Sequence, residues 1–350
     1  MRVFLIGYPG EMGGANTEAW HTIKLWRRAG IEVHLIPTWG RDDVWRRRLA
    51  GLGCKTHHVR PEDLERVPGL AGSPVVGMCN QQFTENAHRF RALGCPLVWV
   101  NCMTFLFEHE KRSFARSGLP DAFVFQSEFQ RSQIEPQLAE FGYRAATGHL
   151  IRGAFDLRAW RFRPRPHGPG EPFVVGRMAR PDLDKWSRDT WAVYGRIQYR
   201  NRWARLLGVD SRTQAKLGPA PEWAQCLGPM AMPVPEFLAS LHCLLPLNGG
   251  ARENWPRAGL EAMAVGVPIV AENQWGWREM IEHGVTGFLG DCQEELAHYA
   301  AVLAYDEELR REMIRKARKR LEKKLANPEV LWRGWRKLFR SLPDSRDAVA

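Results

Sequence analysis

The sequence predicts an α/β protein made of two doubly wound domains, each a mostly parallel sheet with helices on both faces. First, the chain of 350 residues is long for one hydrophobic core and comfortable for two. Second, short apolar runs alternate with amphipathic helical segments in two successive series, the pattern of repeated βα units. Third, residues 161–170 are rich in proline, glycine and arginine, as expected of an exposed connection. We therefore expect one domain over residues 1–155 and another over 156–326.

The first domain begins with a strand, a glycine loop and a helix. The apolar run 2–7 is followed by a loop over residues 8–16 and by a helix over 17–29. Gly13 and Gly14 in this loop would let the backbone approach a ligand closely, and the alternative is a simple tight turn. Further strands are expected at residues 31–37, 75–76, 96–100, 122–126 and 148–151.

The second domain repeats the alternation after the connection. Ligands of doubly wound sheets bind outside the carboxyl ends of the strands, so we expect the site in a cleft lined by both sheets. Strands are expected at residues 172–176, 203–208, 224–228 and 243–247, and helices at 187–198 and 235–240.

Residues 251–271 form the most informative segment of the second domain. Proline suits the first position of a helix and glycine its end, so we expect a helix from Pro256 that ends at Gly266. Its amino terminus would direct N–H groups and the positive end of its dipole toward Glu253, an arrangement that suits a phosphate. Glu261 lies inside this helix, and residues 267–271 read as a short buried strand.

Two glutamates with seven residues between them, followed by Ala-Met-Ala-x-Gly-x-Pro, resemble the signature of the retaining glycosyltransferases of family 4. The resemblance implies a GT-B fold, with two Rossmann-like domains facing across a deep cleft, and transfer of a hexose from a nucleoside diphosphate sugar to an acceptor hydroxyl. It also implies that Glu253 contacts the donor sugar and that Glu261 holds the ribose. Where the family usually has Gly-Phe-Gly, this chain has Asn254, Trp255 and Pro256, which we also place at the donor.

Cations follow the first strand of the second domain. A departing diphosphate needs positive charge, and the family carries an arginine and a lysine there, which implies this role for Arg177 and Lys185. The spacing between them is longer than usual, and Arg180 is the alternative arginine. Asp182 and Asp184 spell the D-x-D pattern of metal-dependent enzymes of another fold. Because cations and a helix amino terminus would already neutralise the leaving diphosphate, we expect neither a metal nor any other cofactor.

Three more elements are similar to the family. The family's sugar-contacting histidine usually lies at the end of a strand, where this chain has Asn101 and Cys102. His109 is therefore the candidate for this role, and the alternative is that it is an ordinary residue on the surface of a helix. The segment 275–279 resembles a Gly-Gly-x-x-Glu element in which Trp275 replaces a glycine, and we expect it to shape the pocket. A final helix over 327–345 is expected to cross back and complete the first domain.

The formal net charge of +11 favours an anionic partner, which on composition alone could be a nucleotide, nucleic acid, an acidic glycan or anionic lipid. The resemblance implies a nucleotide sugar and no nucleic acid, and the hydroxyl acceptor is unknown. Residues 310–324 hold nine lysines and arginines, which either bind anionic membrane lipid or form a solvated helix. Without a long apolar run or a signal-like start, we expect a cytoplasmic protein that could lie at the inner membrane face.

Other sequence features limit the function classes. The seven scattered cysteines predict reduced, buried thiols. The chain contains no Gly-x-Ser-x-Gly elbow and no Walker loop, which argues against a serine hydrolase or a P-loop enzyme. Two rivals stay open: another GT-B enzyme such as a nucleotide-sugar epimerase, and a catalytically silent protein that binds a nucleotide sugar.

Overall fold

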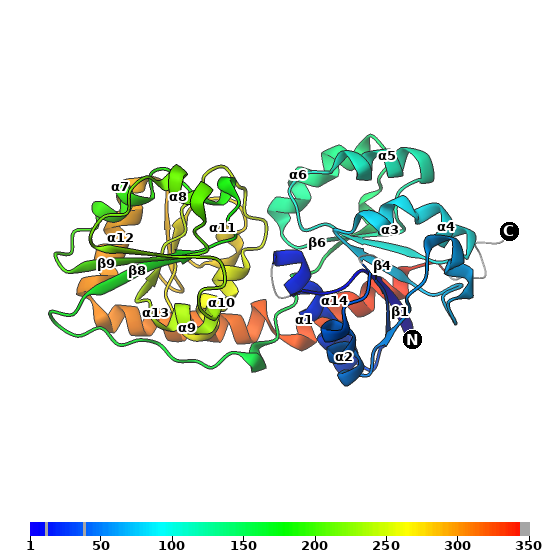
Figure 1. The fold of residues 1–350 in the computed structure, drawn as a ribbon, viewed down its shortest axis with the longest axis horizontal. Helices are drawn as coiled ribbons and strands as arrows, with labels where there is room; N and C mark the ends of the chain where they lie inside the picture. Colours follow the sequence, from blue (N-terminus) through cyan, green and yellow to red (C-terminus); the bar gives the residue numbers. More distant parts are fainter. Residues whose placement is uncertain (11–12, 38–39, 344–350) are drawn as a thin grey trace. The chain divides into compact units, whose positions relative to one another are not determined.

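The computed structural model describes residues 1–10, 13–37 and 40–343 and divides into two compact units (Figure 1). The first unit comprises residues 1–156 together with the chain from Pro328 onward, and the second comprises Leu157–Asn327. Each unit contains a parallel sheet with helices packed against it, so the predicted α/β class is confirmed.

The first unit is built on a seven-stranded parallel sheet of order β3-β2-β1-β4-β5-β6-β7. The order reverses between β1 and β4, which is the position where doubly wound sheets bind their ligands. The strands are β1 (Arg2–Ile6), β2 (Glu32–Ile36), β3 (Lys55–Thr56), β4 (Val75–Met78), β5 (Leu97–Val100), β6 (Ala122–Phe125) and β7 (Gly148–Leu150).

Alternate strand residues of this sheet face two separate cores. Leu5 joins a core with Trp26 and Trp335, whereas its neighbour Phe4 joins the opposite core with Phe83. The helices are α1 (Gly14–Arg28), α2 (Asp43–Gly51), α3 (Gln81–Glu85), α4 (Ala87–Ala92), α5 (Glu108–Ser117), α6 (Glu128–Ala139) and α14 (Pro328–Ser341), with 3-10 turns at Pro61–Arg66 and Ala145–Thr147.

Helix α14 belongs to the first unit although it follows the whole of the second in sequence. Its Trp335 ring meets Trp26 of α1 edge to face at 4.8 Å between centroids, and Phe339 packs on Trp26 at 5.7 Å. Aromatic pairs of this kind add to the free energy of burial. Residues 344–350, which include the end of the expected 327–345 helix, lie outside the described residues.

The second unit contains a four-stranded parallel sheet of order β10-β9-β8-β11 and a parallel β12-β13 pair. A bridge between Leu244 and Ile269 links β11 to the segment before β12. The strands are β8 (Phe173–Met178), β9 (Arg202–Leu207), β10 (Ala224–Leu227), β11 (Cys243–Leu244), β12 (Val270–Glu272) and β13 (Phe288–Gly290).

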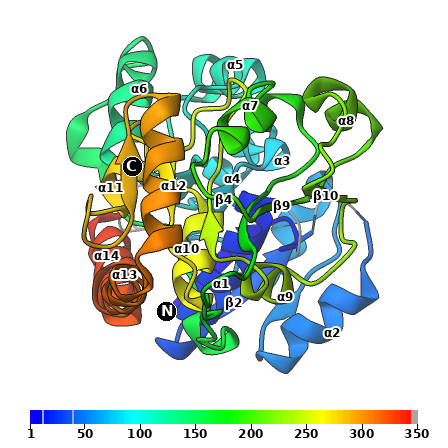
Figure 2. The same ribbon diagram turned by 90° about the vertical axis from the view of Figure 1, so that its left-hand side faces the viewer.

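Helices surround the sheet of the second unit (Figure 2). They are α7 (Thr190–Gly195), α8 (Ser211–Leu217), α9 (Val234–Ala239), α10 (Arg257–Val265), α11 (Trp277–Met280), α12 (Gln293–Tyr305) and α13 (Glu307–Arg320), with 3-10 turns at Leu157–Ala159 and Leu183–Lys185 and a π-helical turn at Leu321–Leu325. The helix expected over 187–198 is shorter, and α8, β3 and β13 were not predicted because their runs are too short to show a period.

Part of the basic segment 310–324 lies inside the second unit. Arg310 is 1% exposed and forms two hydrogen bonds with the carboxylate of Glu307. Arg318 donates to the carbonyl of Ala264 at 2.7 Å, and Arg320 donates to the carbonyl of Met280 at 3.0 Å. The interpretation as a solvated helix is therefore wrong for these three cations. Lipid binding by the other cations of the segment stays a prediction.

Within the described ranges, none of the helices has the length and apolar character needed to cross a membrane.

Candidate functional site

The candidate site lies at the carboxyl edge of the sheet of the second unit. Chain segments leave β8, β11 and β12 at this edge, since these strands are parallel. The segment after β8 holds Lys185 in a 3-10 turn, and the segment after β11 holds Glu253. The carbonyl of Asp184 accepts hydrogen bonds from the N–H groups of Gly249 at 2.9 Å and Ala251 at 3.0 Å, which ties the two segments together.

Lys185 and Glu253, both predicted from the sequence, form an ion pair in the structure. The ammonium Nζ lies 2.8 Å from Oε1 of the carboxylate. The two side chains are 24% and 19% exposed, so they are partly shielded from water but remain within reach of a ligand. The pair places one positive and one negative group side by side at the edge where a ligand of this sheet would bind.

Arg177 is buried beneath the segment that holds Lys185. The guanidinium is 2% exposed and donates to the carbonyls of Leu247 and Lys185, and it stacks over the ring of Trp186 at 4.6 Å. Burial lowers the pKa of Arg177. These two contacts fix the backbone of Lys185 and were not predicted, and a phosphate contact by Arg177 stays a prediction. Arg180, the alternative, is exposed and pairs with Asp182 at 2.9 Å.

Glu261 lies in helix α10, which directly follows the segment that holds Glu253. The helix begins at Arg257, one residue later than predicted, with Pro256 as its N-cap. It ends as predicted at Gly266, whose φ of 99° lies in the left-handed region that favours glycine. Burial raises the pKa of the Glu261 carboxyl to about 7, and the charge of Arg257 opposes this shift. Glu261 therefore titrates near neutral pH.

The segment that departs from the family is packed inward. Asn254, Trp255 and Pro256 are buried, and donor contact by their side chains stays a prediction. The carbonyl of Glu253 accepts a hydrogen bond from the N–H of Gly276 at 2.9 Å. Trp275 just before it is half-buried and has a φ of 52°, a conformation that costs a tryptophan about 1 kcal/mol or more.

Gly276 is required at this packing contact. A Cβ added to Gly276 would lie 1.7 Å from the carbonyl oxygen of Asn254, which is backbone and cannot turn away. We expect Gly276→Ala to displace the backbone of Glu253, to cost about 3 kcal/mol or more in unfolding free energy, and to weaken nucleotide binding. Urea denaturation and calorimetric titration would measure both effects. The control is Gly228→Ala in the same unit, where no atom lies within 4 Å, and equal behaviour of the two variants would contradict the prediction.

Glu272 is a site residue that was not predicted. It ends β12 at the carboxyl edge and accepts a hydrogen bond from the N–H of Asn248 at 3.4 Å. Burial raises the pKa of Glu272, whereas the hydrogen bond from the N–H of Asn248 and the charge of Arg177 lower it. Its position directly after the apolar run 267–271 was the available signal in the sequence.

The other predicted residues belong to the first unit. Gly13 is the N-cap of α1 with a φ of 86°, and Gly14 is the first residue of that helix. His109 lies in the first turn of α5, where its ring stacks on Phe107 at 5.3 Å and burial lowers its pKa. Contact of these residues with a donor or an acceptor stays a prediction.

Both aspartates of the D-x-D pattern have contacts within the second unit. Asp182 forms its ion pair with Arg180, and the carbonyl of Asp184 is used by the loop before Glu253. Over residues 1–10, 13–37 and 40–343, no group of three or more histidine, cysteine, aspartate or glutamate side chains could hold a metal ion. Transfer without a metal stays a prediction.

Comparison with known sequences concerns the second unit. Residues 232–320, which include Glu253 and Glu261, match the model of the family described as glycosyl transferases group 1. The chain is also 34% identical to N-acetyl-alpha-D-glucosaminyl L-malate synthase of Bacillus anthracis over 100 residues, which are 28% of this chain. The match spans about a quarter of that relative, 26% of its length.

Comparison with solved structures concerns almost the whole chain. Anabaena HepE in complex with UDP-glucose superposes with a TM-score of 0.72 at 18% identity, over 97% of this chain and 100% of that one. S. aureus TarM gives 0.75 at 11% identity over 97% and 99%. Sucrose-phosphate synthase from Thermosynechococcus elongatus gives 0.68 at 15% identity over 97% and 98%.

These likenesses define the class of protein by its fold. The chain has the GT-B fold, in which two Rossmann-like α/β domains follow one another in sequence. Within this fold, the match to the model of the group 1 glycosyl transferases covers residues 232–320.

Proposed function

We propose that the protein is a retaining glycosyltransferase that transfers a hexose from a nucleoside diphosphate sugar to an acceptor hydroxyl. The ion pair of Lys185 and Glu253 carries the proposal, because it sets a cation for the diphosphate beside a carboxylate for the sugar at the ligand-binding edge of a parallel sheet. The group 1 match over 232–320 supports it. Since HepE was crystallised with UDP-glucose, this nucleotide sugar is the first donor to test.

The ion pair would exchange partners when the donor binds. A diphosphate carries more negative charge than Glu253 and competes with it for the ammonium of Lys185. The carboxylate of Glu253 is then released to accept hydrogen bonds from the sugar hydroxyls. As the glycosidic bond breaks, negative charge collects on the leaving phosphate oxygen, where Lys185 and the N–H groups at the start of α10 stabilise it.

The resemblance to family 4 implies attack from the face on which the diphosphate leaves. The acceptor oxygen forms a bond to the anomeric carbon while the carbon–phosphate oxygen bond breaks, and the acceptor proton passes to the leaving oxygen. No side chain acts as nucleophile in this scheme. We assign Arg177 a positioning role, because its buried guanidinium donates to the carbonyl of Lys185.

A donor screen followed by product analysis tests the proposal. Nucleotide sugars are first ranked by the increase in melting temperature that they cause, and the best is then incubated with hydroxyl acceptors and followed by NMR. We expect a glycoside with the anomeric configuration of the donor. An inverted product would contradict retention, an epimerised nucleotide sugar would identify an epimerase, and bound but unchanged donor would identify a silent binding protein.

Glu261 should make nucleotide binding depend on pH. Ribose hydroxyls donate to the ionised carboxylate, so protonated Glu261, with its pKa of about 7, must lose a proton before it binds them. We expect the Kd for UDP to be about tenfold higher at about pH 6 than at about pH 8. In Glu261→Gln the binding should be weaker and the pH dependence should vanish. Calorimetric titration at both pH values measures this, and an equal pH dependence in the variant would exclude Glu261 as its source.

A further inference from the structure

Two cysteines lie side by side at the carboxyl edge of the sheet of the first unit. Cys79 directly follows β4, and Cys102 lies two residues after the end of β5. These strands are parallel neighbours with Met78 opposite Val100, and the N–H of Cys79 donates to the carbonyl of Val100 at 3.0 Å. The neighbouring strands that lead to these two cysteines are about 4.8 Å apart, and a disulfide spans a Cα separation of about 4.4–6.8 Å.

The thiol of Cys79 contacts the backbone of Cys102. The N–H of Cys102 donates to Sγ of Cys79 at 3.0 Å. A hydrogen bond between the two thiols raises the pKa of Cys102, and burial raises it further. Gln126, which directly follows β6, also contacts the Cys102 thiol, because its Nε2 lies 3.4 Å from that Sγ. The same Nε2 lies 2.5 Å from Oε2 of Glu18. Neither thiol needs a large movement to reach the other.

The backbone of Cys79 is strained in the conformation that creates this contact. Its φ of 47° lies in the left-handed region, which costs a residue other than glycine about 1–2 kcal/mol. Such conformations persist where the surrounding structure holds them, and they are concentrated at functional sites. Here the conformation brings the thiol of Cys79 to the N–H of Cys102.

The other cysteines differ in their surroundings. Cys54, Cys95 and Cys243 are buried, as expected from the sequence, whereas Cys292 is exposed. Cys79, Cys102 and Cys226 are half-buried.

We propose that Cys79 and Cys102 form a reversible disulfide with a small-molecule disulfide as the oxidant. With oxidised glutathione, one thiol loses its proton and attacks a sulfur, which releases the first glutathione. The second thiol then loses its proton and attacks the mixed disulfide, which releases the second. The two cysteines lose two electrons and two protons in total, and oxidised glutathione becomes two molecules of reduced glutathione.

The link would join two loops at the edge where a doubly wound sheet binds its ligand. It would hold the chain after β4 to the chain after β5, next to the reversal of strand order between β1 and β4. The inference does not depend on the proposed transferase activity, because it concerns the thiols alone.

Peptide mapping of the intact protein tests the proposal. The folded chain is treated with oxidised glutathione, its free thiols are alkylated, and it is digested and analysed by mass spectrometry. We expect the peptides of Cys79 and Cys102 to be joined with the loss of two hydrogen atoms, and to separate after reduction with dithiothreitol. A glutathione adduct on exposed Cys292 shows that the reagent has acted.

Variants connect the product to this pair. Cys102→Ser and Cys79→Gly should both prevent the link, and glycine at position 79 adopts a φ of 47° without strain, so this variant should remain folded. Cys292→Ser should leave the link unchanged. The proposal is overturned if Cys79 and Cys102 are recovered alkylated while Cys292 carries glutathione, or if the link forms only in denatured protein.

Discussion

Lys185→Ala is expected to lower the rate of sugar transfer by about 10²–10³-fold, the loss seen when one group that stabilises transition-state charge is removed. The ammonium of Lys185 is held at the candidate site by the Glu253 carboxylate at 2.8 Å and by the Arg177 bond to its carbonyl. Because the side chain is 24% exposed, we expect the variant to lose only about 1 kcal/mol of stability or less. Initial rates with saturating acceptor, together with circular dichroism, measure both.

Glu253→Ala should behave similarly, and the double variant should be little worse than either single one. Groups that act as a unit are not additive, because removing one already removes most of the joint effect. The matched control is Lys316→Ala, which breaks a lysine–glutamate ion pair with Glu312 at 2.6 Å on the surface of α13. It should transfer sugar at the wild-type rate. A fully active Lys185→Ala, or multiplied losses in the double variant, would remove the ion pair from the mechanism.

The strands and the motif that contains Glu253 and Glu261 could be predicted from the sequence, because each depends on residues close together in the chain. The run 2–7 and the cap at Gly266 are visible as an apolar stretch and a glycine at the end of a helical pattern. The approach of Lys185 to Glu253 was expected only through the spacing of a known motif, since 68 residues separate them. A local sequence pattern does not show a contact between residues that are far apart in the chain.

The features that could not be predicted depend on burial. The sequence shows that an arginine lies at the end of a strand, but it does not show whether the side chain binds a phosphate or, as Arg177 does, two backbone carbonyls. The contacts of Gly276 and Glu272 likewise appear only when β12 lies beside the segment after β11. The prediction of a solvated helix over residues 310–324 failed for Arg310 for the same reason. The charge of the segment is visible in the sequence, but the burial of Arg310 is not.

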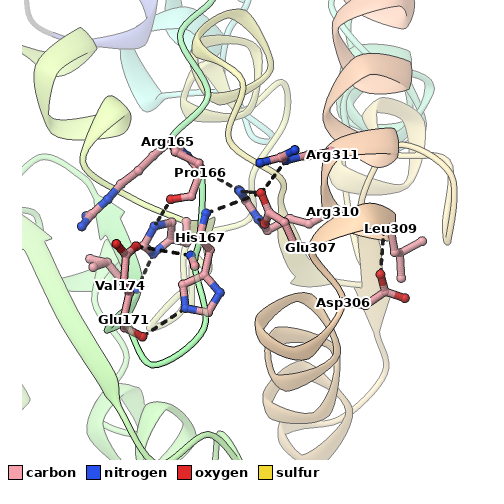
Figure 3. A network of polar contacts seen from close by, with 12 residues as sticks. Arg165, Pro166, His167, Glu171, Val174, Asp306, Glu307, Leu309, Arg310 and Arg311 are labelled. Atoms are coloured by element: carbon pink, nitrogen blue, oxygen red, sulfur yellow. Dashed lines mark hydrogen bonds and ion pairs between the residues drawn. The ribbon is translucent and has the colours of Figure 1, made fainter.

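The network around Arg310 joins the start of the second unit to its last helix (Figure 3). Arg310 of α13 donates to the carbonyl of Arg165 at 2.7 Å as well as to Glu307. The N–H of His167, in the same stretch of chain, donates to Glu307 at 3.4 Å, and its ring contacts the carbonyl of Glu171 at 3.1 Å. The connection predicted over residues 161–170 is mostly exposed, and its contacts at Arg165 and His167 fix it to α13.

Arg310→Ala is expected to cost about 3 kcal/mol of unfolding free energy, because it removes the buried cation that bonds the carbonyl of Arg165 and leaves the partly buried carboxylate of Glu307 with only the exposed Arg311 of its two cations. Arg311→Ala is the matched control: it pairs with the same Glu307 at 2.7 Å but is 59% exposed, so it should cost about 1 kcal/mol or less. Urea denaturation measures both losses, and hydrogen exchange of α13 amides locates them. Equal losses in the two variants would show that burial does not set the strength of this ion pair.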